Sequence, residues 1–244
     1  MAATIGYLGH ASVLVDLDGI RFVTDPLLRR RVAHLRRLVP SPSVPADVDA
    51  ILLSHGHQDH LDLGSLRRLD RDACVLVPAG LGTLVERRGF GSVDEVEPGD
   101  EREIGGVTVR ATPALHEGGR PPLRPRAGAV GYALLGSVRI YFAGDTDLFP
   151  ELEGLVPDLD VALVPVWGWG RRADSGHLDP ERATEAVRRL RPRIAIPIHW
   201  GTYGVAGGMW GRGREPAEEF AGHVARVAPD VEVRILDPGE STDL

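Results

Sequence analysis

The pattern of apolar and polar positions predicts strands in the first part of the chain. Three short apolar runs separated by turn residues predict strands at 5–8, 12–16 and 20–24. A fourth run, Ala50–Ser54, leads directly into the sequence His55-Gly-His57-Gln-Asp59-His60. We therefore expect this histidine cluster to lie on a loop that follows a strand.

Further along the chain, predicted strands alternate with helices. Apolar runs predict strands at 74–77, 107–111, 130–135, 138–142, 161–164, 193–197 and 231–236. Leucines at three-residue spacing behind Asp62 predict a short helix directly after the cluster. Asp179-Pro180 predicts the start of another helix, because an acid caps a helix and proline suits its first turn, and a last helix is expected near 215–227. The whole pattern predicts one α/β domain over residues 1–244, with two sheets packed face to face and helices outside.

Composition narrows the classes of partner. The formal net charge is −7 over 244 residues, which disfavours a general nucleic-acid binder, although a small anionic substrate stays open. The single cysteine, Cys74, excludes an internal disulfide, and its apolar surroundings predict a buried thiol in a reducing cytosol. No signal segment and no apolar run of about 20 residues is found, so we expect a cytoplasmic protein without a transmembrane segment. The sequence leaves open whether the protein forms a homo-oligomer.

The residue types of the cluster favour a metal site. In an extended segment, His55 and His57 point the same way, Asp59 follows at the next step, and His60 faces elsewhere, so the cluster can divide its ligands between two ions. Chance clustering on a solvated loop is the alternative, but burying these groups together without a metal costs on the order of several kcal/mol. More metal-ligating side chains follow apolar runs elsewhere in the chain, namely His116, Asp145 and His199. These distant candidates strengthen the metal interpretation.

The order of these residues resembles a known family. His-x-His-x-Asp-His after a strand, then an isolated His, a Gly-Asp-Thr and a final His, is similar to the metallo-β-lactamase superfamily over essentially the whole chain. The resemblance implies a four-layer αββα sandwich of two mixed sheets, with the metals at one edge of the sheets. It implies two metal sites, with the first ion held by His55, His57 and His116, the second by Asp59, His60 and His199, and Asp145 bridging them.

Shorter motifs resemble one branch of that superfamily. The branch includes ascorbate-6-phosphate lactonases and N-acylphosphatidylethanolamine phospholipase D. The motifs are Gly9-His10-Ala11-Ser12, Thr24-Asp25-Pro26, His177-Leu-Asp-Pro180-Glu-Arg-Ala and His199-Trp-Gly-Thr202.

The expected activity follows from this resemblance and from the metals. Two divalent ions, Zn2+ first and Mn2+ or Fe2+ as alternatives, would lower the pKa of a bridging water and generate hydroxide. That hydroxide would attack an ester, lactone or phosphodiester of a small, anionic substrate, and catalytic Asp59 would orient it or accept its proton. A mononuclear iron oxygenase of the same fold and a nuclease of the superfamily are the alternatives. The complete set of seven ligands argues against the first, and the net charge argues against the second.

Other residues are candidates for contact with the substrate. His177 precedes a helix N-terminus, which suits anion binding or catalytic proton donation, with a structural histidine as the alternative. The loop after His116 carries Arg120, Arg124 and Arg126, which could clamp an anion or simply be solvated.

Three further features have less specific context. Trp167 could wall an apolar cleft, although large aromatic side chains more often pack. His10 lies in a turn, where a structural role and a place in the site are both open. The arginines at 29–31 and 36–37 predict a solvated basic face of a helix.

Overall fold

The computed structural model describes residues 3–43, 47–117, 127–167, 176–205 and 213–244. In this part of the chain, two seven-stranded sheets and one three-stranded sheet are formed. The first sheet has the order β17 (Ser241–Asp243), β1 (Thr4–Gly9), β2 (Ser12–Leu17), β3 (Ile20–Thr24), β6 (Ala50–Leu52), β7 (Cys74–Pro78) and β8 (Val93–Val96). The second has the order β16 (Glu232–Val233), β14 (Ile194–Ile198), β13 (Val161–Pro165), β12 (Arg139–Phe142), β11 (Val130–Leu135), β10 (Val107–Pro113) and β9 (Glu101–Ile104). The small sheet has the order β15 (Tyr203–Val205), β5 (Leu35–Arg37) and β4 (Arg31–Val32).

Both large sheets are mixed and repeat one pairing order. In the first sheet, β17, β1, β2 and β3 pair antiparallel in succession, and β3, β6, β7 and β8 then pair parallel. In the second sheet, β9, β10, β11 and β12 pair antiparallel, and β12, β13, β14 and β16 pair parallel. Strands β1, β3 and β6 of the first sheet therefore correspond to β10, β12 and β13 of the second.

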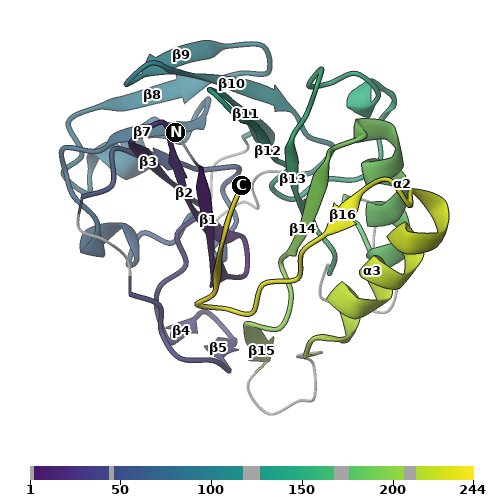
Figure 1. Ribbon diagram of the computed structural model, residues 1–244. Helices are drawn as coiled ribbons and strands as arrows, with labels where there is room; N and C mark the ends of the chain where they lie inside the picture. Colours follow the sequence, from purple (N-terminus) through teal and green to yellow (C-terminus); the bar gives the residue numbers. More distant parts are fainter. Residues whose placement is uncertain (1–2, 44–46, 118–126, 168–175, 206–212) are drawn as a thin grey trace.

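The two sheets enclose the main core, and helices cover the outside. Side chains of β1, β2, β10, β11, β12 and β13 meet in one large buried cluster, to which α2 (Pro180–Leu190) and α3 (Glu215–Val227) also contribute. Figure 1 shows α2 and α3 on the outer face of the second sheet. A second cluster lies on the other side of β6 and β7, beneath α1 (Gly82–Glu86) and the short 3-10 helix η1 (Leu66–Arg68). The αββα sandwich expected from the sequence is confirmed.

The parallel strands at the centre of the second sheet are buried on both faces. All five residues of β13 and all five of β14 are buried, as expected for strands covered by helices on one side and by the other sheet on the opposite side. The helix predicted at Asp179-Pro180 is α2, and the Asp179 side chain accepts a hydrogen bond from the Arg182 N–H as its N-cap. A second 3-10 helix, η2 (Pro150–Leu152), follows β12. In the described part of the chain, no helix has the length and apolar character needed to cross a bilayer.

The short helix expected behind Asp62 is the single 3-10 turn η1, and the Asp62 carboxylate accepts bonds from the backbone N–H and hydroxyl of Ser65 just before it. Two other local predictions were wrong. The arginine-rich segment 29–37 forms the hairpin β4–β5 instead of a helix, with Ala33 in the left-handed region at its turn. Cys74 is half-buried at the start of β7 instead of fully buried.

Candidate metal centre

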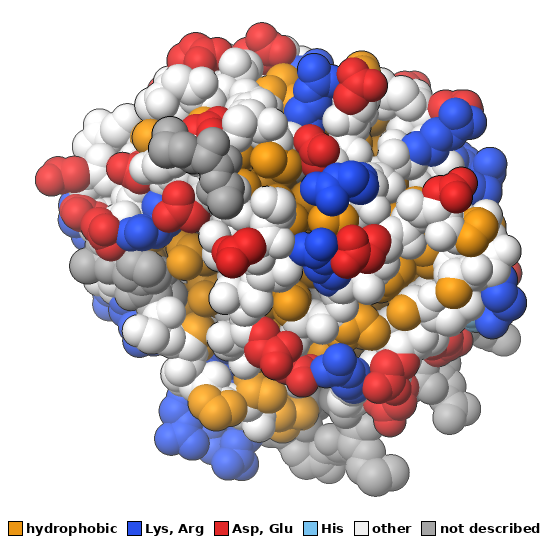
Figure 2. All heavy atoms as spheres, viewed as in Figure 1, with side chains coloured by type: hydrophobic (Ala, Val, Ile, Leu, Met, Phe, Trp, Pro, Cys, Tyr) orange, Lys and Arg blue, Asp and Glu red, His pale blue; other side chains and the backbone are white. Residues whose placement is uncertain are grey.

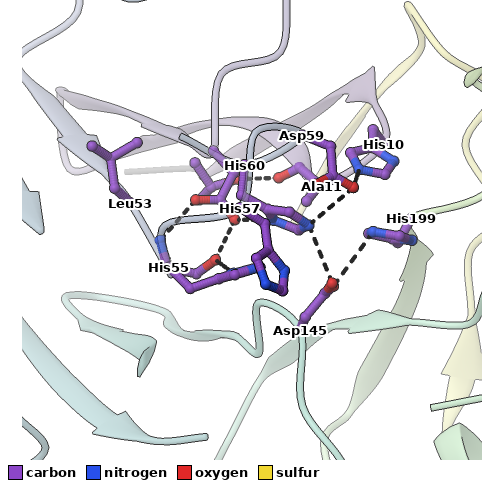
Figure 3. A network of polar contacts seen from close by, with 12 residues as sticks. His10, Ala11, Leu53, His55, His57, Asp59, His60, Asp145 and His199 are labelled. Carbon is purple, nitrogen blue, oxygen red and sulfur yellow. Dashed lines mark hydrogen bonds and ion pairs between the residues drawn. The ribbon is translucent and has the colours of Figure 1, made fainter. Parts of the chain in front are cut away.

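The seven predicted metal-site residues meet where strands of both large sheets end. His55 follows β6, His116 follows β10, Asp145 follows β12 and His199 follows β14. Their side chains converge with those of the loop that carries His57, Asp59 and His60, as Figure 3 shows for those it labels. Because the carboxyl ends of neighbouring parallel strands meet at one edge of a sheet, residues distant in sequence are brought together there.

Four imidazole rings are held by hydrogen bonds on their outer nitrogen. Each Nδ1 atom lies within hydrogen-bond distance of an oxygen on the outer side of the site. The pairs are His55 with Ser54 Oγ at 2.9 Å, His60 with Asp25 Oδ2 at 2.7 Å, His116 with the Gly176 carbonyl at 2.7 Å and His199 with the Trp167 carbonyl at 2.5 Å. Anchoring Nδ1 in this way fixes the ring and leaves Nε2 to face a metal, which is typical of histidine ligands.

The inward-facing atoms lie close together. The Nδ1 atom of His57 is 3.2 Å from the Nε2 atom of His116. Two nitrogen ligands of one tetrahedral zinc, each about 2.0–2.1 Å from the ion, are about 3.3 Å apart. Among the described residues, the buried Nε2 atom of His55 has no hydrogen-bond partner, although it lies beside these two rings. Such a buried polar atom requires a partner, and a cation supplies one.

Asp145 connects the two halves of the cluster. Its Oδ2 atom is 3.2 Å from the Nε2 atom of His60, and its Oδ1 atom is 3.4 Å from the Nε2 atom of His199. The carboxylate is almost fully buried, with 3% of its side chain exposed. Burial raises the pKa of Asp145, but the surrounding His199 and His60 outweigh this effect and hold the pKa well below its ordinary value.

The electrostatics of the site favour a bound positive charge. Burial lowers the pKa of His60, but the carboxylates of Asp145 and Asp25 outweigh it and hold the pKa well above its ordinary value. A cation placed between these carboxylates is therefore stabilised, whether it is a proton or a metal ion. The pKa of Asp59 is likewise held well below its ordinary value, because His10 and His60 outweigh the effect of burial.

Other histidines of the site favour the neutral form that binds metals. Burial lowers the pKa of His55 well below its ordinary value, and the neighbouring His60 lowers it further. Burial also lowers the pKa of His199 to about 3 and that of His116 by a smaller amount. A neutral imidazole has a free lone pair, so the described donor set fits divalent metal ions.

The predicted substrate residues are only partly placed. His177 lies at the edge of the cluster, with its Nε2 atom 3.4 Å from Asp145 Oδ2 and 17% of its side chain exposed. Burial lowers the pKa of His177, but Asp145 outweighs it and raises the pKa above its ordinary value. Trp167 is partly buried against the main core, and its carbonyl accepts the bond from His199. Arg120, together with Arg124 and Arg126, lies outside the described residues.

Sequence reasoning did not assign roles to Asp25, Ser54 and His10. Asp25 is fully buried, and besides His60 it accepts bonds from the Ser54 backbone N–H at 2.7 Å and from the Ser54 hydroxyl at 2.5 Å. Asp25 directly follows a predicted strand, which is the same signal that made His116, Asp145 and His199 candidate metal ligands. His10 is 2% exposed and lies beside Asp59, with its Nε2 atom 3.3 Å from Asp59 Oδ2.

Three residues of the site have an uncommon backbone conformation. His10, Asp25 and His199 have positive φ angles of 59°, 33° and 63°, respectively. Residues other than glycine rarely adopt this conformation, and where it persists, surrounding contacts hold it, often at functional sites. Here the His199 N–H donates to the His10 carbonyl at 2.7 Å, which joins two of these turns directly.

This fold and this candidate site define a class of proteins, αββα sandwiches with a cluster of histidines and carboxylates where strands of both sheets end. A family model described as a beta-lactamase superfamily domain matches residues 20–200 of the chain. The chain therefore belongs to the metallo-β-lactamase superfamily and is a metal-dependent hydrolase.

Curated relatives support this assignment. The chain is 32% identical over 252 residues to a UPF0173 metal-dependent hydrolase of Methanopyrus kandleri, covering 97% of this chain and 98% of that protein. It is 34% identical over 227 residues to N-acyl-phosphatidylethanolamine-hydrolyzing phospholipase D 1 of Caenorhabditis elegans, covering 81% of this chain. The match spans only 63% of the nematode protein's length.

Solved structures share the fold at lower identity. Igni18, a metallo hydrolase from Ignicoccus hospitalis, superposes with a TM-score of 0.76 at 23% identity, covering 100% of this chain and 99% of that one. CmlA, a diiron beta-hydroxylase from Streptomyces venezuelae, superposes with a TM-score of 0.70 at 21% identity, covering 99% of this chain and 54% of that one. The αββα scaffold is thus shared by proteins described as a hydrolase and as a hydroxylase.

Proposed function

We propose that this protein is a dinuclear hydrolase, with zinc as the preferred metal, that cleaves an ester, lactone or phosphodiester of a small, anionic substrate with water as the nucleophile. The observation that carries the proposal is the set of four imidazoles fixed by outward hydrogen bonds around the buried carboxylate of Asp145. A structural histidine cluster has no need to direct its inner nitrogens toward one another.

The donors divide into two groups that suit two ions. His55, His57 and His116 offer ligand atoms that all lie within 4.8 Å of one another, and we assign them to the first ion. Asp59, His60 and His199 meet the same criterion, and we assign them to the second. The oxygens of Asp145 face His60 and His199, and Asp145 also offers a ligand atom within 4.8 Å of one from His116, which supports a bridging position for this carboxylate.

Two divalent ions in these positions would activate water at neutral pH and polarise the bond that it attacks. The residues of the chain supply the remaining functions. Asp59, whose pKa is held low, stays ionised and can orient the water or accept its proton. His177, partly exposed at the edge of the cluster and with a raised pKa, is placed to donate a proton to the leaving group.

The substrate class is supported by the chemistry of the relatives and by the charge of the surface. The nematode relative is named for hydrolysis of a phospholipid, which is a phosphodiester. We propose a related substrate class for this chain. The net charge of −7 supports a small molecule better than a nucleic acid, and the face in Figure 2 shows acidic and basic side chains interspersed. Trp167 and Arg120 remain proposed substrate contacts.

A second candidate is an iron-dependent oxygenase of the same fold. CmlA, a diiron beta-hydroxylase, shares the fold at 21% identity, so the iron alternative, mononuclear or dinuclear, rests on the ligand chemistry of the site. Histidine and carboxylate ligands also suit iron, so metal preference and reaction must be tested together.

The test is a screen of lactones, phosphodiesters and acyl esters with zinc-loaded, manganese-loaded and iron-loaded protein, with metal-free protein as the control. We expect hydrolysis of one class that depends on zinc or manganese. Oxygen consumption by the iron-loaded protein, with no hydrolysis of any class by the other forms, would replace the proposal with the oxygenase.

A further inference from the structure

His10 is held in the metal centre from both sides of its backbone. Its N–H donates to the Thr202 hydroxyl at 2.7 Å, and its carbonyl accepts from the His199 N–H at 2.7 Å. Gly9, at φ 108°, leaves no room for a side chain, because a Cβ atom there would lie 2.7 Å from Thr202 Cγ2 and 2.9 Å from an Arg37 nitrogen. The turn between β1 and β2 is therefore fixed against the loop that carries His199.

The imidazole of His10 is directed at one proposed ligand. Its Nε2 atom lies 3.3 Å from Asp59 Oδ2, and its ring centroid lies 3.8 Å from that of His199. Figure 3 shows His10 and Asp59 side by side at the edge of the network. His10 thus contacts the group assigned to the second ion. In the sequence it lies 49 positions before Asp59.

Asp59 needs such a partner more than Asp145 does. The Asp59 side chain is 18% exposed and lies on a loop, whereas that of Asp145 is 3% exposed. A loop carboxylate that reaches solvent has more rotamers available than a buried one, and fixing one rotamer lowers the entropy lost when a metal binds. The four outward hydrogen bonds described above fix the histidines, and the bond from His10 fixes the carboxylate.

A purely structural role does not explain an imidazole at this position. Asn or Gly would adopt the left-handed turn more readily than His, and an apolar ring would fill the buried space without a polar atom to satisfy. The topology gives independent support, because His10 follows β1 as His116 follows β10, the corresponding strand of the second sheet.

We propose that His10 is a positioning residue that donates a hydrogen bond from Nε2 to Asp59 Oδ2 and thereby holds this carboxylate toward the second metal ion. The inference rests on the proposed two-metal function. It predicts a selective effect on the second ion, because His10 contacts Asp59, His60 and His199, the residues assigned to that ion.

The test compares His10→Asn with His10→Gln. Both variants carry an amide, but only the glutamine side chain is long enough to approach Asp59, and asparagine adopts the left-handed turn well. His34→Asn, at an exposed position in the turn between β4 and β5, is the control for the substitution itself. Each metal-free protein is titrated with Zn2+ in competition with a chromophoric chelator, and far-UV circular dichroism verifies the fold.

We expect His10→Asn to weaken binding of the second zinc by about 10- to 100-fold and to leave the first zinc within about threefold of the wild type. We expect His10→Gln to restore the affinity for the second zinc to within about tenfold of the wild type, and His34→Asn to match the wild type. Equal binding of both ions by His10→Asn and the wild type would overturn the inference while leaving the two-metal proposal intact.

Two other results would also overturn it. If His10→Gln and His10→Asn both lose the second ion as completely as Asp59→Ala does, His10 is itself a ligand. If the wild type binds a single zinc, both the inference and the proposed function fail. If His10→Asn does not fold, the test uses His10→Gln and Asp59→Ala. A folded His10→Gln variant that binds the second zinc no better than Asp59→Ala does would decide against the inference.

Discussion

The Nδ1 atom of His60 lies 2.7 Å from the Oδ2 atom of Asp25, and both side chains are fully buried. This pair connects the ends of two adjacent parallel strands, because β3 and β6 are in register with Thr24 opposite Leu52. Asp25 directly follows β3, and the loop that carries His60 follows β6. The carboxylate thus fixes the ring of a proposed ligand from outside the metal centre.

Asp25→Asn should weaken zinc binding by about 10- to 100-fold, because the amide keeps the shape of the side chain but removes the charge that supports His60. Chelator competition on the metal-free protein measures this effect. Asp49→Asn, an exposed aspartate near the start of β6, is the matched control and should not change zinc affinity. Equal affinities for Asp25→Asn and the wild type would mean that the buried pair has only a structural role.

Asp145→Ala and Asp59→Ala should each abolish hydrolysis of the substrate identified in the screen, because each removes a carboxylate assigned to the metals. The fold should persist, since both side chains lie at strand ends outside the main apolar core. Steady-state kinetics and circular dichroism measure the two effects. Retained turnover by either variant would refute its assigned role.

His177→Gln should lower kcat by about 100-fold or more while leaving the zinc content unchanged, because the variant loses a proton donor but no assigned ligand. The measurement pairs kinetics with elemental analysis of the same sample. A substrate whose leaving group needs no proton should lose much less activity, and an equal loss with both substrates would argue for a structural role of His177.

Asp62 stabilises the turn that follows the histidine cluster, and its contribution depends on pH. Burial raises the pKa of Asp62, but Arg29 and Ser65 outweigh it and lower the pKa below its ordinary value. A carboxyl with a lowered pKa in the folded state stabilises that state above the pKa of the unfolded chain, and this stabilisation is lost as the pH falls through the folded-state pKa.

Asp62→Asn should therefore lower the free energy of unfolding at pH 7 by about 1–3 kcal/mol, since the Arg29 guanidinium and the Ser65 hydroxyl lose a charged acceptor. The difference between variant and wild type should shrink as the pH falls below about 4. Urea unfolding at a series of pH values tests this. A difference that stays constant down to the lowest pH would contradict it.

Much of the fold and of the candidate metal centre could be predicted because both depend on local patterns. Apolar runs predicted the central strands, and the His and Asp residues at the ends of those runs predicted that His116, Asp145 and His199 would lie close together. The capping residue Asp179 marked the start of α2. The predicted last helix, 215–227, coincides with α3.

The remaining features depend on contacts that no local pattern encodes. Asp25 and His10 act on residues 35 and 49 positions away, and their partners are defined only by the order of strands in the sheet. The hairpin β4–β5 consists of short strands with exposed arginines, so its periodicity did not distinguish it from a helix. The last predicted strand, 231–236, is limited in the structure to the two residues of β16.

The number of metal ions per chain tests the central claim most directly. Protein purified without added metal is examined by elemental analysis, and its mass is measured under native conditions before and after treatment with a chelator. We predict about two zinc ions per chain, both removed by the chelator, and their loss should abolish hydrolysis. A single ion per chain, or two iron ions with no hydrolytic activity in the zinc form, would contradict the dinuclear zinc hydrolase.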